Sequence, residues 1–358
     1  MQKTAKRHLW LWGLWLLAFY TAWSWLVLGG GLRPVLAEQW PIALAMALGS
    51  FAAGSTPMGG GTVGFPVLVL LFDLPAALGR DFSFAVQSIG MTSASIFILA
   101  RRQALAFAVL KGALLGCLLA LPVGVFLIAP LLPDLWIKLI FAVTWGSFGL
   151  LHLYRIREIA GLTGMIEFDE RWDFRGGVLL GAIPSLTVVA ASGVGVDMVV
   201  YAALVLMFRA DLKIAIPTSV VIMAFASVYG SVLKLCTTGM QPGVFEQWLA
   251  AAPVVALGAP LGVFVVERIG RAPILLFVAA LCVGQLAWTL HEEYAVLGPG
   301  GAVVALLAVG ILLLAFEGLR RYGAMLAGER DRGRHHRSLG IEDVQPHVGS
   351  QRPPPGNE

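Results

Sequence analysis

Residues 40–74 constrain this chain more than any other stretch, because two apolar arms flank a break rich in glycine and proline. The arms cover 41–53 and 62–72, and the break at 54–61 contains Pro57 and three consecutive glycines. Each arm has about 11–14 residues, whereas a hydrocarbon core of ~30 Å requires ~20 residues of helix. A continuous helix through the break is disfavoured. We predict a re-entrant hairpin whose tip is buried in protein or faces a wet cavity near the bilayer centre.

A second broken hairpin, predicted over 176–208, indicates an internal duplication. A shift of 136 residues places Leu-Val-Leu at 68–70 on the same triplet at 204–206. With two residues of slippage, Pro-Val-Gly-Val-Phe at 122–126 aligns with Pro-Leu-Gly-Val-Phe at 260–264. Paired interrupted segments in the two halves of a chain point to the substrate site of a transporter.

The composition excludes an ordinary soluble domain. Hydrophobic residues make up 58% and charged residues 13% of the chain, and mean hydropathy is +0.82, whereas a soluble domain carries about 25% charge. The sequence predicts an all-α polytopic membrane protein. The net charge of +4 sits mostly in ends and loops and implies no nucleic acid. The three cysteines predict neither a disulfide framework nor a metal site, and no cofactor is expected.

Eight full crossings are predicted besides the two hairpins. An N-terminal segment (1–38) holds the first apolar stretch (9–30), whose length favours a retained span over a cleaved signal peptide. The other units are repeat 1 (39–154: hairpin 40–73, helices 82–100, 105–130 and 135–154), a cytoplasmic loop (155–175), repeat 2 (176–290: hairpin 176–208, helices 213–235, 246–266 and 272–290), a last helix (291–318) and a basic, disordered tail (319–358).

The basic residues predict the orientation. With the N-terminus in the cytoplasm, the basic clusters at 101–102, 155–157, 268–271 and 320–337 all fall on the cytoplasmic side. The first hairpin then enters from outside and the second from the cytoplasm. Each repeat has three full crossings, so the repeats are inverted. Full crossings by the hairpin arms would fit the charges equally, and arm length is the argument against them. We expect a multi-pass inner (cytoplasmic) membrane protein with both termini cytoplasmic.

Both hairpin tips predict an anion site. The second arm of each begins with backbone N–H groups that have no intrahelical acceptor, at the positive end of the helix dipole. Glycines allow close approach of a ligand, and hydroxyls add donors. The predicted substrate residues at the tips are Ser55, Thr56, Gly59, Gly60, Gly61, Ser192, Gly193 and Gly195. The alternative is that the glycines only let helices cross closely.

Polar residues in the helices after the hairpins complete the predicted site. Ser83 and Gln87 are four residues apart and share a helix face. Thr218 and Ser219 occupy the equivalent place in the second half. The alternative for the hydroxyls is a bond to their own helix, whereas the amide of Gln87 needs a partner in an apolar environment.

Four ionisable residues lie at or near membrane depth in the predicted topology. Asp197 follows the second tip, and either it exchanges a proton, coupling transport to the proton gradient, or it is a fixed charge at a helix N-terminus. Lys111 and Lys234 are predicted to snorkel from span ends, with a substrate role for either as the alternative, and His152 is predicted to be a boundary residue. No HExxH, GxSxG or Walker-type motif occurs, and no acid pair suggests an intramembrane protease.

Several short motifs together resemble the sulfite exporter TauE/SafE family over about residues 40–290. They are Gly54-x-x-x-x-Gly59-Gly60-Gly61 with Pro66, the run Gly79-Arg80-Asp81-Phe82-Ser83, the Pro-x-Gly-Val-Phe pair, and Thr218-Ser219. The resemblance implies inner-membrane transport of small sulfur-containing or organic anions, and it carries the substrate role onto the tip glycines. The second tip departs from the pattern, with Val194, Val196 and Asp197 where a glycine cluster is usual.

The sequence therefore predicts a secondary transporter that exports a small anion such as sulfite or a sulfonate. Import of an organic acid or sulfonate is the main alternative. A membrane enzyme, or a non-transporting assembly protein, is a distant one. The expected partners are a small anion and the lipid bilayer, with proton coupling as an option, and the oligomeric state stays open.

Overall fold

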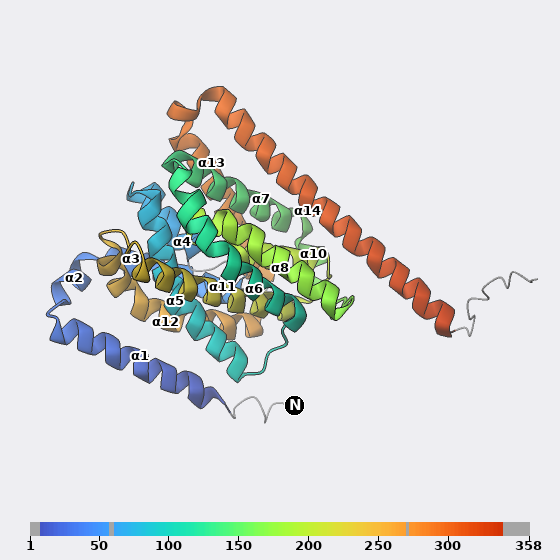
Figure 1. Cartoon of the computed structure of the whole chain (residues 1–358), viewed down its shortest axis with the longest axis horizontal. Coiled ribbons are helices and arrows are strands. Elements are labelled where there is room, and N and C mark those ends of the chain that lie inside the picture. The colour runs from blue at the N-terminus through green and yellow to red at the C-terminus, as the bar shows by residue number, and fades with distance from the viewer. Residues whose placement is uncertain (1–7, 57–60, 270–271, 339–358) are drawn as a thin grey trace, which may run out of the picture.

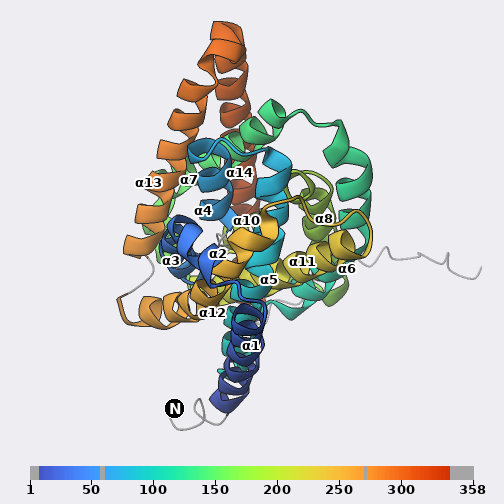
Figure 2. The same cartoon turned by 90° about the vertical axis from the view of Figure 1, so that its left-hand side faces the viewer.

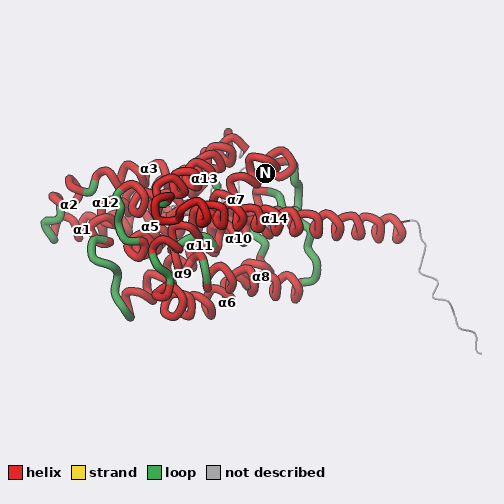
Figure 3. The backbone as a smooth tube through the Cα atoms, turned by 90° about the horizontal axis from the view of Figure 1, so that it is seen from above, coloured by secondary structure: helices red, strands yellow, loops and turns green. Residues whose placement is uncertain are grey.

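The computed structural model describes residues 8–56, 61–269 and 272–338 (Figure 1). Every regular element in these residues is a helix (Figure 3). The helices are α1 (Leu9–Gly29), α2 (Arg33–Glu38), α3 (Trp40–Ser55), α4 (Gly61–Pro66), η1 (Val67–Leu71), α5 (Ala76–Ala100), α6 (Phe107–Val123), η2 (Gly124–Ile128), η3 (Ala129–Leu131), α7 (Asp134–Ala160), α8 (Glu170–Leu186), α9 (Val188–Ser192), α10 (Val196–Leu206), α11 (Leu212–Cys236), α12 (Val244–Ile269), α13 (Ala272–Glu292) and α14 (Tyr294–Ser338).

The predicted class, an all-helical multi-pass membrane protein, is confirmed. Nine segments of the described chain are long and apolar enough to cross a membrane. Eight of them overlap the eight predicted crossings. The ninth, Glu170–Ser192, covers the first arm of the second predicted hairpin.

The argument from arm length therefore fails for this arm. We expected it to begin at residue 176, but α8 begins at Glu170, because the side chain of Asp169 accepts a hydrogen bond from the backbone N–H of Arg171 and caps the helix. The connection predicted over 155–175 shrinks accordingly to the stretch between α7 and α8. Length supports a hairpin for α3, which has 16 residues, and for α10, which has 11.

Backbone contacts nevertheless bring the two ends of the second hairpin together. The N–H of Ile166 donates to the carbonyl of Phe208 at 2.8 Å, and the N–H of Asp211 donates to the carbonyl of Gly164 at 2.6 Å. The chain therefore enters and leaves this hairpin at one place. Between these ends, α8 and α9 run up to a break at residues 193–195, and α10 returns.

Small residues set the closest helix contacts. A Cβ atom at Gly112 or Gly116 of α6 would overlap the backbone of α8, and one at Gly177 or Gly181 of α8 would overlap the backbone of α6. Likewise α3 packs along α12, where a Cβ at Gly54 would overlap the carbonyl of Ala259. Such spacing lets membrane helices approach backbone to backbone. The other extensive pairs are α7 with α13, and α5 with both α11 and α12.

Contacts between loops and helix ends form two groups, here called face 1 and face 2. Face 1 holds the starts of α5 and α7, the end of α11 and the α13–α14 turn. Its contacts are Ala76 N–Asp134 Oδ2 (3.3 Å), Lys234–Asp81 (3.4 Å) and Lys138–Glu293 (2.6 Å). Face 2 holds the ends of α7 and α10 and the starts of α6 and α11. Its contacts are Arg209–Glu158 (3.7 Å), Arg155–Glu317 (3.3 Å) and Ala106 N–Thr218 Oγ1 (3.0 Å).

Two long helices lie at the periphery of the bundle (Figures 1 and 2). The indole Nε1 of Trp12 in α1 donates to Ser93 of α5 at 3.0 Å, and that of Trp23 donates to the carbonyl of Leu249 in α12 at 2.9 Å. Helix α14 packs on α7, α10 and α13 and continues to Ser338. It therefore extends into the stretch from residue 319 for which we predicted a disordered tail, and residues 339–358 lie outside the described chain.

Candidate functional site

The second hairpin tip is built on two glycines with left-handed backbone. Gly193 has φ +79° and Gly195 has φ +120°, and both lie between α9 and α10. A Cβ atom at Gly193 would come within 2.5 Å of the Arg80 carbonyl oxygen and 2.9 Å of Ser83 Cβ. One at Gly195 would lie 3.1 Å from the indole of Trp145. The tip therefore requires glycine both for its backbone conformation and for its contact with α5 and α7.

Helix α5 is the element around which the hairpins are arranged. It contacts α3 and α4 of the first hairpin and α9 of the second, as well as α1, α7, α11 and α12. The side-chain amide of Gln87 on α5 donates to the Gly193 carbonyl at 3.2 Å and to the Ser83 carbonyl at 3.1 Å. Its Oε1 is buried and has no hydrogen-bond partner within the described residues. Gln87 thus holds the second tip with its nitrogen and presents an unused acceptor oxygen.

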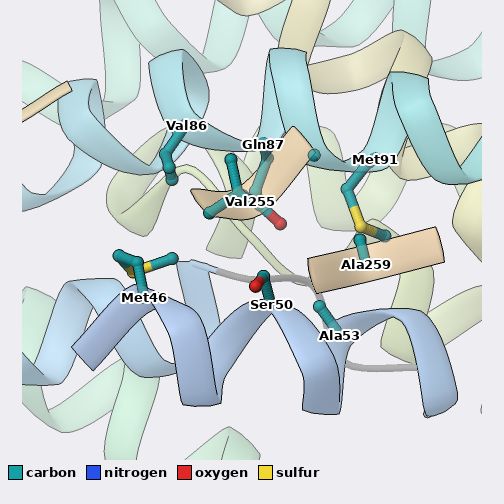
Figure 4. A pocket seen from close by; sticks show the side chains of 9 residues that line it. Met46, Ser50, Ala53, Val86, Gln87, Met91, Val255 and Ala259 are labelled. Atoms are coloured by element: carbon teal, nitrogen blue, oxygen red, sulfur yellow. The ribbon is translucent and has the colours of Figure 1, made fainter. Parts of the chain in front are cut away.

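A small cavity, here called the central cavity, lies on the other side of Gln87, between α3, α5 and α12 (Figure 4). Its volume is about 10 Å³, on the scale of a single water. Gln87 and Ser50 point into the same gap from α5 and α3 (Figure 4). The other lining residues are Met46, Ala53, Val86, Gly90, Met91, Val255 and Ala259. Of the predicted site residues that the structure describes, Gln87 is the one that lines this cavity.

The predicted hydroxyl residues mostly bond to their own helices. Ser83 donates to Gly79, Thr56 to Ala52, and Ser219 to Ile216, at 2.7–2.8 Å. Ser192 Oγ lies 2.8 Å from the Val188 carbonyl. Thr218 donates to Ile214 and accepts from the N–H of Ala106 at 3.0 Å, so it joins α11 to the start of α6 on face 2. A hydrogen bond from the hydroxyl to its own helix was the alternative to a substrate role for these residues.

The first tip falls largely outside the described residues. Gly59 and Gly60 lie there, and Gly61 begins α4. Ser55 is the last residue of α3 and Thr56 is its buried C-cap. The substrate role predicted for these residues stays a prediction.

Asp197 lies in the first turn of α10 and is 1% exposed. Its Oδ1 accepts the backbone N–H of Met198 at 2.9 Å. A carboxylate here satisfies an N–H group at the helix N-terminus and interacts favourably with the helix dipole.

Two sequence-based expectations about ionisable residues are wrong. Lys234 does not snorkel: it is 5% exposed and its Nζ lies 3.4 Å from Asp81 Oδ2. His152 is not a boundary residue, because it is buried on α7 and its Nε2 lies 3.1 Å from the hydroxyl of Tyr201 on α10. The Arg-Asp pair at 80–81 at the start of an apolar helix was the available signal for a buried ion-pair site. Lys111 is exposed.

No curated protein and no solved structure matches the chain. Residues 42–288, about two thirds of the chain, match the family described as sulfite exporter TauE/SafE. The matched region runs from the first hairpin to the end of α13 and includes α5, Gln87 and both tips. This chain therefore belongs to the sulfite exporter TauE/SafE family of membrane transporters.

Proposed function

We propose that this protein is a secondary transporter that exports a small anion, sulfite or a sulfonate, across the cytoplasmic membrane. The observation that carries the proposal is the bridge from Gln87 to the carbonyl of Gly193. This bridge joins the tip of a broken helix to a small, mostly apolar cavity beside the first hairpin, whose polar lining residues are Gln87 and Ser50. Broken helices that meet at polar groups are the way in which many secondary transporters build a substrate site. Import of an organic acid or sulfonate by the same site is the alternative.

The two halves of the chain are proposed to be inverted repeats with eight full crossings and two re-entrant hairpins. The packing partners support this. If α3, α5, α6 and α7 of the first half correspond to α8, α11, α12 and α13 of the second, the contact of α6 with α8 has its counterpart in the contact of α12 with α3. The contacts of α5 with α11 and of α7 with α13 then join equivalent helices of the two halves. In this proposal face 1 is outside and face 2 is cytoplasmic, which places both termini in the cytoplasm.

The central cavity corresponds to a closed state of the transporter. A volume of about 10 Å³ holds no more than a water, so binding an oxyanion requires the elements around it to separate. Rocking of one repeat against the other would open the cavity to each face in turn. For the anion to bind, the amide N–H groups of Gln87 would exchange the carbonyls of Ser83 and Gly193 for it, and N–H groups at the start of α10 would donate alongside them.

Asp197 is proposed to couple this movement to protons. A charged carboxylate near the start of α10 would repel an anion, and burial disfavours the charged form. Protonation when the anion binds, and release on the other face, would link the two fluxes.

Flux measurements in proteoliposomes test the proposal. Sulfite, thiosulfate, a sulfonate and a carboxylate are loaded on one side, and release is followed for both orientations of the protein. We expect sulfite or sulfonate flux in wild type, at least ten-fold less in Gln87→Met, and normal flux in Ser88→Ala, because Ser88 is absent from the cavity lining. No flux of any tested anion, or equal flux in Gln87→Met and wild type, would contradict the proposal.

A further inference from the structure

A second cavity, much larger than the central one, opens at face 1. Its volume is about 440 Å³. The walls come from the starts of α5 and α7, from η2 and η3, from the end of α11 and from the loop that follows it. Arg80, Asp134, Lys234, Thr238 and Gln241 are its polar lining residues.

Two buried cations in this cavity share one carboxylate. Arg80 and Lys234 are 7% and 5% exposed, and Asp81 between them is 0% exposed. Arg80 Nε lies 2.9 Å from Asp81 Oδ1, and Lys234 Nζ lies 3.4 Å from Asp81 Oδ2. The N–H of Gln241 also donates to Oδ2, at 3.1 Å. The buried group therefore carries one positive charge in excess, and a buried charge is costly unless it is compensated.

The remaining acid of the cavity is not placed to supply this compensation. Asp134 is exposed, and its Oδ2 accepts the backbone N–H of Ala76 at 3.3 Å, at the start of α5. Solvent screens an exposed carboxylate far more than a buried one. The excess charge at Arg80 and Lys234 therefore lacks a buried counter-ion within the described residues.

Both cations keep donors for a ligand. Arg80 engages Asp81 through Nε, which leaves the Nη1 and Nη2 groups of a guanidinium that suits oxyanions. Lys234 Nζ donates to Thr238 Oγ1 at 2.7 Å and pairs with Asp81, and an ammonium has three donors. Donors from two cations around one cavity match the several acceptor oxygens of a small oxyanion.

The cavity lies directly against the second hairpin tip. The Arg80 carbonyl is the atom that a Cβ at Gly193 would meet, and a Cβ at Gly124, which precedes the lining residue Val125, would meet Ala190 of α9. We propose that Arg80 and Lys234 form a second anion site, for a free small oxyanion, at face 1. The site itself does not depend on the proposed function, whereas any part that it takes in anion export rests on that function.

Binding is measured on purified full-length protein in nanodiscs of zwitterionic lipid, by titration with sulfite or sulfate at constant ionic strength. Lys234→Met leaves Asp81 paired with Arg80, so the fold is retained and the excess charge is removed. We expect its affinity for the oxyanion to fall by about ten-fold or more. Asp81→Asn adds a net positive charge, and we expect tighter binding. Lys111→Met, at an exposed lysine, is the matched control and should bind like wild type.

Wild-type affinity in Lys234→Met, or weaker binding by a folded Asp81→Asn protein, would overturn the site. Competition by phosphatidylglycerol added to the nanodiscs would assign these cations to a lipid headgroup and overturn the free-anion assignment. Gln87→Met separates the two proposals, because it removes the central amide and leaves the face 1 cavity intact. Binding that persists in Gln87→Met and disappears in Lys234→Met supports the second site, whatever the flux measurements give.

Discussion

The second arms of the two broken hairpins are embedded differently. In the second hairpin, α10 is buried along almost its whole length. In the first hairpin, the second arm ends with Leu71 and Phe72, which are 63% and 46% exposed. Helices α8 and α11 pack along α10, and α14 covers its end so closely that a Cβ at Gly323 would meet the backbone of Met207. The second hairpin is thus enclosed by protein on more sides than the end of the first hairpin, which we expect to shift at lower cost.

The largest effect is expected from a side chain at the second tip. Gly193→Val would have to adopt a left-handed backbone and would overlap Arg80 and Ser83. These costs sum to about 3 kcal/mol or more, so we expect little folded protein. Gly310→Val is the control, because nothing lies within 4 Å of a Cβ there. Yield of monodisperse protein after detergent extraction is the measurement. A wild-type yield of Gly193→Val would contradict the conclusion that the second hairpin is held more tightly than the first.

Gly60→Leu should act on transport and leave insertion intact. Gly60 lies in the predicted tip of the first hairpin, outside the described residues, and the bulky side chain would block approach of the anion to the backbone. We expect normal membrane expression with flux reduced to background. Normal flux at normal expression would mean that the first tip only packs.

Asp197→Asn should abolish the response of transport to a pH gradient and leave anion exchange intact. An amide cannot exchange the proton, so we expect anion exchange to persist while net flux stops following an imposed pH gradient. Flux is measured in proteoliposomes with and without the gradient. If the variant still responds like wild type, the hydrogen bond from Met198 defines the role of Asp197 as a helix cap.

Cysteine labelling at the ends of the two hairpins should leave activity nearly unchanged and test the topology. Asp73→Cys follows the first hairpin, and Arg209→Cys follows the second, both at loop positions with positive φ. In sealed, oriented vesicles we expect an impermeant reagent to label them from opposite sides. Labelling of both from one side would exclude inverted hairpins.

The helical class, the spans and the positions of both breaks follow from the sequence, because their causes are local. Hydrophobic length selects membrane helices, and Gly193 and Gly195 mark a break that needs left-handed backbone. The start of α8 was missed, although its cause, the cap by Asp169, is local as well.

The partners of the polar residues were decided by the tertiary structure. Lys111 and Lys234 both looked like snorkelling lysines, yet Lys234 is buried because folding brings Asp81 to it from another helix. Gln87 was singled out as needing a partner, but the partner, Gly193, is 106 positions away in the chain. A buried polar group is stable only when its bonding requirement is met. Which group meets it depends on helices packed in space, and that information is absent from any single stretch of sequence.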